Sequence, residues 1–269
     1  MTAVSPGFSA DHHSAPALIA LSLVTSTQAE AKAQAHQGCA HGVVVVAQEQ
    51  SAGRGRRGRT WLSGRHGLWM SMVLRVDLPM TRAPRLSLCA CAAVADVLHK
   101  AAVDVFVKWP NDLMVAAPTS HPLLGCFRKA GGLLIEAVDV EGDRLRTAVL
   151  GVGINLSAPA GGFTADLGDS AGAVTDAGFD VEALPRLALA ALLQTALIHI
   201  APHTDDAAFA AVRQQLSARS ATLGRVVRVE GPPCIVGTAI GFSSDGALQI
   251  EDHNTGEVHL VHAGDVMLA

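Results

Sequence analysis

Paired cysteines are missing from this sequence. It has five cysteines, an odd number, and none of them belongs to a C-x-x-C pair. A disulfide framework is expected to use an even number of cysteines and a zinc ribbon needs C-x-x-C pairs, so neither is expected. A reducing compartment is the default for such a chain, and we expect a cytoplasmic protein.

Long hydrophobic runs and targeting signals are missing as well. Near the N-terminus the longest apolar stretch is 17–24, which Ser22 interrupts, whereas a membrane-spanning helix needs about 20 apolar residues. No lysine or arginine precedes Lys32, so the basic region of a signal or transit peptide is not found. We therefore expect no membrane segment and no cleaved leader.

A large net charge is also absent. Twenty basic and twenty-four acidic side chains give a net charge of −4 at pH 7. The chain as a whole thus presents no cationic surface, and neither DNA nor a membrane is expected as a partner. Any strong positive potential must be local. The apolar content of 49% is enough to fill a sizeable core.

A common zinc-protease signature is not found, because the sequence contains no H-E-x-x-H. The pairs His199/His203 and His259/His262 have spacings that could hold a metal ion. No carboxylate or cysteine completes either set, and we interpret both pairs as incidental. No metal site made of protein ligands is predicted.

Periodic segments predict a chain of mixed helices and strands. T-Q-A-E at 27–30 has the form of a capping box, with Gly38 as a stop. Helices are expected at 27–37 and 85–100, after Asp180, and at about 205–219. Strands are expected at 43–47, 68–76, 104–108, 132–138 and 146–152. The stretch 157–179 has little periodicity and is expected to be a long loop or an active-site flap.

The character of the sequence changes at Gly224. From there to Ala269, short β-like runs alternate with turns rich in Gly, Pro and Asn. This pattern is typical of a small β-barrel. The runs lie at 225–230, 234–241, 247–252 and 258–261.

The stretch G-R-G-R-R-G at 53–58 fits the glycine template of a dinucleotide-binding turn, yet four arginines crowd residues 54–59. That turn needs a helix opening on its last glycine, because the helix N-terminus carries the pyrophosphate. A polar stretch and then a strand follow Gly58 instead, so the dinucleotide interpretation fails.

The four arginines must therefore supply the charge. Their forked guanidinium groups can bind phosphate or carboxylate oxygens by two parallel hydrogen bonds. For the loop taken alone, a solvated basic loop and an RNA-contacting arginine patch remain open alternatives.

Three further motifs combine glycine or proline with polar side chains at the ends of expected strands. K-W-P-N-D at 108–112 turns at its proline, and we expect Asn111 and Asp112 in that turn. Glycines recur at 131–132 and 151–153, where a strand glycine often marks the close approach of a ligand or backbone. Each motif is weak alone, since a lysine at a strand end is commonly a solvated edge residue.

Taken in order, the motifs closely resemble those of the biotin protein ligases. The matching motifs are S-T at 26–27, G-R-G-R-R-G-R-x-W at 53–61, K-W-P-N-D at 108–112, K-x-G-G-L at 129–133 and G-x-G-x-N at 151–155.

The resemblance implies an α/β (α+β) fold. Members of the family have a mixed sheet with helices on one side, similar to class II aminoacyl-tRNA synthetases and lipoate ligases, and a C-terminal SH3-like barrel. We expect a loose arm at 1–16, a catalytic domain at 17–222 and an SH3-like domain at 223–269. Some members carry an N-terminal DNA-binding winged helix. Only about twenty residues precede the first motif here, so the monofunctional type is expected.

The resemblance also implies the reaction. The carboxylate of biotin attacks the α-phosphate of ATP, which releases pyrophosphate and forms biotinyl-5′-AMP. A lysine of a biotin carboxyl carrier domain of a carboxylase then takes the biotinyl group. Magnesium ion should shield the triphosphate, although the sequence identifies no ligands for it. Whether the enzyme is a monomer or a homodimer stays open.

The resemblance also implies which residues of this sequence form the site. The resemblance implies catalytic roles for Arg54, Lys108 and Asp112, the last of which would orient or deprotonate the incoming lysine. It implies biotin binding by Ser26, Thr27, Gln50, Gly53, Arg54, Arg56, Trp69 and Lys108. It implies binding of ATP and the adenylate by Arg54, Arg56, Arg57, Arg59, Trp61, Asn111, Lys129, Gly132 and Asn155. Of these, Arg56, Arg57 and Arg59 would form a mobile lid.

The sequence departs from the family pattern in three places. Gln28 stands where members usually have Asn, and 116–122 is longer than the compact turn of bacterial members. The Ser/Thr-Ser-Leu segment that often follows the last motif is not recognisable in 157–179. Two rival functions remain: a lipoate or octanoate ligase of the same fold, and an RNA-binding module built on the arginine loop.

Overall fold

In the computed structural model of this chain, the described residues are 16–121, 125–164, 167, 170–230 and 234–268. The arm expected at 1–16 therefore lies, apart from Pro16, outside the described residues. No helix in the described part is long and apolar enough to cross a membrane.

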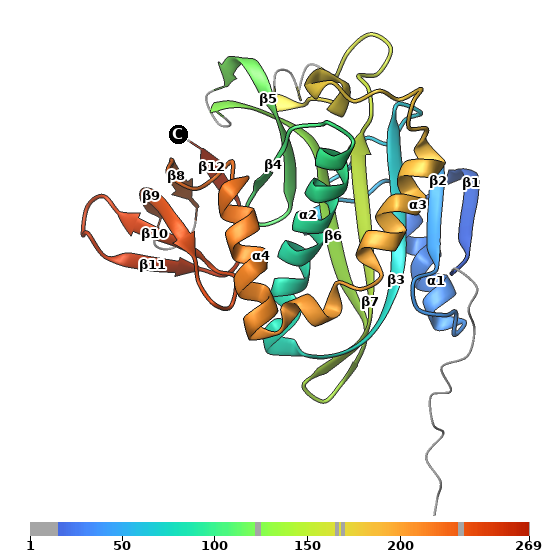
Figure 1. The fold of residues 1–269 in the computed structure, drawn as a ribbon, viewed down its shortest axis with the longest axis horizontal. Coiled ribbons are helices and arrows are strands. Elements are labelled where there is room, and N and C mark those ends of the chain that lie inside the picture. Colours follow the sequence, from blue (N-terminus) through green and yellow to red (C-terminus); the bar gives the residue numbers. More distant parts are fainter. Residues whose placement is uncertain (1–15, 122–124, 165–166, 168–169, 231–233, 269) are drawn as a thin grey trace, which may run out of the picture.

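A mixed sheet of seven strands forms the centre of the described chain, in the order β1-β2-β3-β7-β6-β5-β4 (Figure 1). Only β1 and β2 pair in parallel, and the other neighbours are antiparallel. The strands are β1 Leu18–Val24, β2 Val44–Gln50, β3 Gly67–Pro79, β4 Val105–Lys108, β5 Asp112–His121, β6 Gly125–Glu141 and β7 Arg144–Asn155. Local sequence patterns predicted all of them except β1 and β5.

Two details of the expected turns differ from the structure. Asn111 lies in the turn after β4, but Asp112 is already the first residue of β5. The long stretch expected at 116–122 continues β5 as far as His121, and residues 122–124 lie outside the described part. Asp112 thus belongs to a sheet, which holds its backbone more firmly than a turn does.

Helices cover both faces of this sheet, which corrects the expectation of helices on one side. They are α1 Thr27–His36, α2 Ala83–Lys100, α3 Arg186–Leu197 and α4 Asp206–Ala218. Successive residues of a strand face opposite sides. In β3, Met70 and Met72 accordingly join the core under α2 and α3, whereas Val73 packs with Ala31 and Ala35 of α1.

The first helix also begins differently from the capping-box prediction. Ser26 is its N-cap residue, and no side-chain capping hydrogen bond forms there. Thr27 is the first helical residue, and its hydroxyl contacts Gln50 and Ser71 instead. Tertiary partners have replaced the local capping bond.

A second, antiparallel sheet of five strands contains the C-terminal residues, in the order β11-β10-β9-β8-β12. Its strands are β8 Val226–Val229, β9 Ile235–Phe242, β10 Leu248–Asp252, β11 Val258–Val261 and β12 Val266–Leu268. Four were predicted, and β12 was not. This sheet fits the expected SH3-like barrel, and the α/β (α+β) fold class is confirmed.

The two sheets are joined at the K-W-P-N-D turn. Trp109 is buried, and its indole Nε1 donates a hydrogen bond of 3.0 Å to the carbonyl oxygen of Gly246, between β9 and β10. Its backbone N–H donates to Thr222 Oγ1 at 3.0 Å. The C-terminal sheet is therefore attached directly to a predicted site motif.

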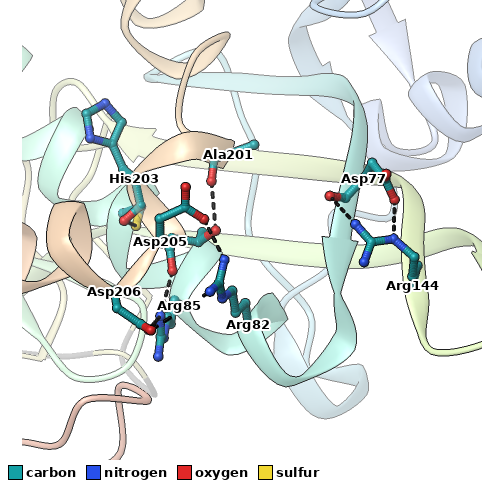
Figure 2. Close-up of polar contacts among 10 residues, drawn as sticks. Asp77, Arg82, Arg85, Arg144, Ala201, His203, Asp205 and Asp206 are labelled. Atoms are coloured by element: carbon teal, nitrogen blue, oxygen red, sulfur yellow. Dashed lines mark hydrogen bonds and ion pairs between the residues drawn. The ribbon is translucent and has the colours of Figure 1, made fainter.

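A polar cluster fixes α4 against the start of α2 (Figure 2). Arg85 of α2 is buried and donates to the carbonyl oxygen of Thr204 at 2.6 Å and to Asp206 Oδ1 at 2.7 Å. Arg82 donates to Asp205 at 2.5 Å. Because β9 packs against α4, these bonds help to place the C-terminal sheet beside the large one.

Candidate active site

A cavity of about 300 Å³ opens on the α1 face of the large sheet, next to the C-terminal sheet. Thirteen of the predicted site residues line it: Ser26, Thr27, Gln50, Arg54, Arg56, Arg59, Trp61, Trp69, Lys108, Asn111, Asp112, Lys129 and Gly132. Eleven of them come from four separate motifs, and Gln50 and Trp69 lie outside the motifs. The fold therefore brings together segments that are more than a hundred residues apart in the chain.

Glycines on β7 allow the cavity to exist. A Cβ atom on Gly151 would lie 2.6 Å from Gln28 Oε1, and one on Gly153 would lie 3.0 Å from Trp61 Nε1. Real Cβ contacts are almost never as short as 2.6 Å, and 3.0 Å is tighter than nine in ten of them, so a larger residue would force Gln28 or Trp61 to shift. The two glycines of the last motif, Gly151 and Gly153, thus let α1 and Trp61 lie close to β7 at the floor of the cavity.

One end of the cavity is a network of neutral polar groups in which Thr27, Ser63 and Ser71 are buried and Gln50 is half-buried. Gln50 Oε1 accepts hydrogen bonds from the backbone N–H of Thr27 at 2.8 Å and from its hydroxyl at 3.1 Å. Gln50 Nε2 donates to Ser63 Oγ at 2.8 Å. Such a network holds donors and acceptors in fixed directions and suits a ligand group that is polar but uncharged.

The same network includes two residues that the sequence analysis did not assign to the site. Ser71 Oγ lies 2.9 Å from Thr27 Oγ1 and donates to Gln28 Oε1 at 3.0 Å. Gln28 Nε2 in turn donates to the carbonyl oxygen of Val149 at 3.0 Å. The alternation of 68–76 would have placed Ser71 on the same face as Trp69, and this was the available signal.

Aromatic rings form an apolar wall. Trp69 is 1% exposed, and its Nε1 donates to the carbonyl oxygen of Gly64 at 2.8 Å. Its ring meets that of Trp61 edge to face, with 6.5 Å between centroids. The Nζ atom of Lys129 lies 5.1 Å from the centroid of Trp61, a cation–π distance.

The other end of the cavity is cationic around one carboxylate. Lys129 Nζ lies 2.6 Å from Asp112 Oδ1, and Lys108 Nζ lies 3.6 Å from Asp112 Oδ2. Burial lowers the pKa of Lys108, while the charge of Asp112 opposes that shift. Two ammonium groups near one carboxylate leave a net positive charge, which favours an anionic ligand.

The arginine loop, residues 53–61, covers this end. Arg56 Nη1 donates to Asn111 Oδ1 at 2.8 Å, and Asn111 Nδ2 donates to the carbonyl oxygen of Leu133 at 2.6 Å. Burial lowers the pKa of Arg56. Arg57 and Arg59 both donate to Asp265, which no sequence pattern had identified.

Three predicted residues are not among those that line the cavity. Gly53 is the first residue of the loop, and a Cβ atom there would be 2.4 Å from Ser63 Oγ. Arg57 turns to Asp265. Asn155 is buried, and its Nδ2 donates to the carbonyl oxygen of Gly172 at 2.9 Å. The proposed roles of all the site residues in binding remain predictions.

Among the described residues, no group of three or more His, Cys, Asp and Glu side chains could hold a metal ion. Of the two carboxylates that line the cavity, Asp112 is already paired with two lysines and Asp265 with two arginines. His259 and His262 approach different carboxylates, Asp252 at 3.5 Å and Asp245 at 3.3 Å. Magnesium ion would fit this cavity chiefly through phosphate oxygens of a nucleotide.

Comparison with known proteins identifies the family. Residues 20–155 match the model of the biotin/lipoate A/B protein ligase family. The bifunctional ligase/repressor BirA of Bacillus subtilis is 36% identical over 162 residues, which are 60% of this chain and 46% of that protein. The chain thus spans about half the length of that relative. The biotin–[acetyl-CoA-carboxylase] ligase of Mycobacterium tuberculosis is 31% identical over 252 residues, 90% of this chain and 85% of that protein.

Solved structures agree in fold. The biotin protein ligase of Aquifex aeolicus in complex with biotin and ATP has a TM-score of 0.73 at 23% identity, with 94% of this chain and 98% of that chain covered. The ligase of Leishmania major in complex with biotinyl-5-AMP has a TM-score of 0.57 at 27% identity, with 92% and 99% covered. From the family match and these alignments together, we conclude that the chain belongs to the biotin/lipoate A/B protein ligase family.

Proposed function

We propose that this protein is an ATP-dependent biotin protein ligase. It would form biotinyl-5′-AMP from biotin and ATP and then transfer the biotinyl group to a lysine of a biotin carboxyl carrier domain. The observation that carries this proposal is a single cavity with three adjoining parts: the Gln50 network, the Trp69 wall and the cationic cluster around Asp112.

These three parts correspond to the three parts of biotin. Its ureido ring is neutral and needs fixed donors and acceptors, which Thr27, Gln50 and Ser71 supply. Its thioether ring needs an apolar surface such as Trp69. Its carboxylate needs cations, which are found at Lys108 and Lys129. The dithiolane of lipoate would leave the buried polar network without partners, at a cost in binding free energy.

The first step joins two anions. A carboxylate oxygen of biotin forms a bond to the α-phosphorus of ATP, and the bond to the pyrophosphate oxygen breaks. Negative charge gathers on the α-phosphate in the transition state, so cations fixed in advance lower the barrier. Arg54, Lys108 and Lys129 are assigned to this role, and magnesium ion would neutralise charge on the departing pyrophosphate.

The second step needs a neutral amine. The lysine amine of the acceptor attacks the acyl carbon, AMP leaves, and the amine must lose a proton. Its ordinary pKa near 10.4 keeps it charged at neutral pH. Asp112 is assigned to orient the amine and to accept that proton, because it is the carboxylate that lines the cavity between Lys108 and Lys129.

Exchange of labelled pyrophosphate into ATP tests the first step. We expect exchange that depends on biotin and is not supported by lipoate or octanoate. Exchange with lipoate or octanoate alone would move the assignment to the rival ligase. Salt-sensitive RNA binding without any exchange would favour the RNA-binding alternative.

A further inference from the structure

The C-terminal sheet supplies one wall of the candidate active site. Gly264, Asp265 and Val266, at the start of β12, line the same cavity as the arginine loop. Arg57 Nη1 donates to Asp265 Oδ2 at 3.1 Å, and Arg59 Nη2 donates to the same oxygen. One carboxylate, about two hundred residues away in the chain, therefore binds two of the four loop arginines.

The arginines of the loop are directed to two different places. Arg57 has φ 55° and ψ 33°, a left-handed conformation that residues other than glycine seldom adopt. Arg56 points to Asn111 on the cavity side, whereas its neighbour Arg57 points to Asp265. The loop is thus attached on both sides, to the large sheet through Asn111 and to the C-terminal sheet through Asp265.

Charge balance also favours a holding role for Asp265. Burial tends to raise its pKa, but the hydrogen bond from Arg59 and the charges of Arg57 and Arg56 outweigh burial, so the pKa is lowered. The carboxylate is therefore ionised at neutral pH. The two guanidinium groups are 54% and 60% exposed, so without Asp265 their side chains have no described partner that would keep them over the cavity.

We propose that Asp265 is a positioning residue of the adenylation site. Through Arg57 and Arg59 it holds the arginine loop against the C-terminal sheet, so that Arg54 and Arg56 stay over the cavity and the acyl-adenylate is retained between the two steps. The retention of adenylate rests on the proposed function, whereas the holding of the loop does not.

Hydrogen exchange of the full chain measures the holding of the loop directly. Two loop amides are informative, because Gly55 N–H donates to Arg59 O at 2.8 Å and Trp61 N–H donates to Gly53 O at 2.9 Å. In Asp265→Asn, we expect deuterium uptake over 53–61 to be about fivefold faster, because two exposed ion pairs are lost at once. Asp265→Glu keeps the charge and should return uptake to near the parent rate.

Matched variants separate the contact from general effects. Glu251→Gln removes the same charge from an exposed side chain of β10 that has no ion pair in the described part of the chain, and uptake should equal that of the parent. The double variant Arg57→Gln/Arg59→Gln removes the partners instead and should reproduce the fast uptake. Adding Asp265→Asn to it should change nothing more, since residues acting through one contact are not additive.

Activity tests the second half of the proposal. For Asp265→Asn we expect about fivefold more biotin on bystander lysines per acceptor modified, in step with the opening of the loop, and a higher KM for ATP. A merely structural role would reduce the amount of folded protein and leave that KM unchanged. Bystander labelling and KM equal to the parent's would overturn retention by Asp265.

Uptake over 53–61 that is unchanged in both Asp265→Asn and the double variant would overturn the whole inference. If Asp265→Asn fails to fold, the double variant decides alone, because its two side chains are exposed. If the parent shows no biotin-dependent pyrophosphate exchange, the proposed function fails. The hydrogen-exchange data still establish or overturn the holding of the loop.

Discussion

Lys129 and Asp112 are bound to each other at the cationic end of the cavity, with 2.6 Å between Nζ and Oδ1. The other oxygen of Asp112 lies 3.6 Å from Lys108. This one carboxylate is therefore the counter-ion of two lysines from different motifs. Its charge should affect both the two lysines, which are proposed to bind phosphate, and the amine that is expected to enter in the second step.

The pH dependence of the first step should report on Lys108. Burial holds the pKa of this lysine below the ordinary 10.5, so its ammonium form is lost at a lower pH than in a free lysine. Biotin-dependent pyrophosphate exchange should fall on the alkaline side with an apparent pKa below 10.5. The negative charge of Asp112 raises the pKa of Lys108. Asp112→Asn removes that charge, so the alkaline limb should move to still lower pH.

The same shift affects stability, with a definite sign. Because the folded-state pKa of Lys108 is lowered, burial of the charge destabilises the fold below that pKa, and the penalty disappears as pH rises towards 10.5. The free energy of unfolding of Lys108→Met should therefore vary less with pH over that alkaline range than that of the parent.

Lys108→Arg tests the activity assignment, because its guanidinium does not titrate in this range. It should abolish the alkaline limb of the pyrophosphate-exchange profile, and an unchanged limb would exclude Lys108 as its source.

Arg56→Gly should release adenylate into solvent. The substitution removes the hydrogen bond to Asn111 and loosens the loop at its cavity side. We expect more labelling of bystander lysines than with the parent, measured on a mixture of unrelated proteins. Arg228→Ala, which removes an exposed guanidinium on β8, serves as the control. Equal labelling by Arg56→Gly and parent would show that Arg56 is not part of a lid.

Gly151→Ala should disturb the polar network through Gln28. Its Cβ would lie 2.6 Å from Gln28 Oε1, and overpacking of this kind costs about 1–3 kcal/mol. We expect a lower urea midpoint and a higher KM for biotin. In a Gln28→Asn background the shorter side chain makes room, so the same substitution should cost less.

Gly132→Ala is the matched control for stability, because its Cβ would meet nothing nearer than 3.5 Å. A Gly151→Ala variant as stable as Gly132→Ala, in either background, would contradict the proposed crowding.

Arg85→Met should lower stability without touching the cavity. It removes the buried donor to the Thr204 carbonyl oxygen, and an unpaired buried acceptor costs about 1–3 kcal/mol. Arg82→Met, at a more exposed position in the same cluster (Figure 2), should cost less. Urea unfolding of both variants measures the difference. Equal losses would mean that the burial of Arg85 does not matter.

Thiol labelling should divide the cysteines by burial. Burial raises the pKa of Cys89 to about 12 and raises that of Cys91 as well. Cys126 and Cys234 are exposed. With iodoacetamide at pH 8, native protein should be labelled at Cys126 and Cys234 and spared at Cys89 and Cys91, as read by peptide mass spectrometry. Denatured protein, in which all five should react, is the control.

Much of the fold followed from local patterns. The four-residue spacing of Leu86, Ala90 and Val94 predicted α2, and these residues are fully buried in the structure. Strand β1 was missed because its residues Leu18–Val24 sit at a sheet edge with irregular burial, so neither clean alternation nor a fully buried run marks them. Strand β5 was missed because its first residue was read as part of a turn.

Motifs and spacing in the chain were sufficient to determine the family resemblance, the alternation of elements and most of the residues that line the cavity, because glycines, caps and periodic apolar positions act over a few residues. Only the tertiary structure decided that Ser71 and Gln28 join the polar network, that Asp112 stands between two lysines, and that Asp265 binds the arginine loop. The contacts of Ser71 with Gln28 and of Asp265 with Arg57 join residues far apart in the chain, and Asp112 meets its two lysines across neighbouring strands, so these distances depend on how the strands, sheets and helices pack. No local pattern carries that information, since hydrogen bonds and ion pairs act only between atoms that packing has already brought together.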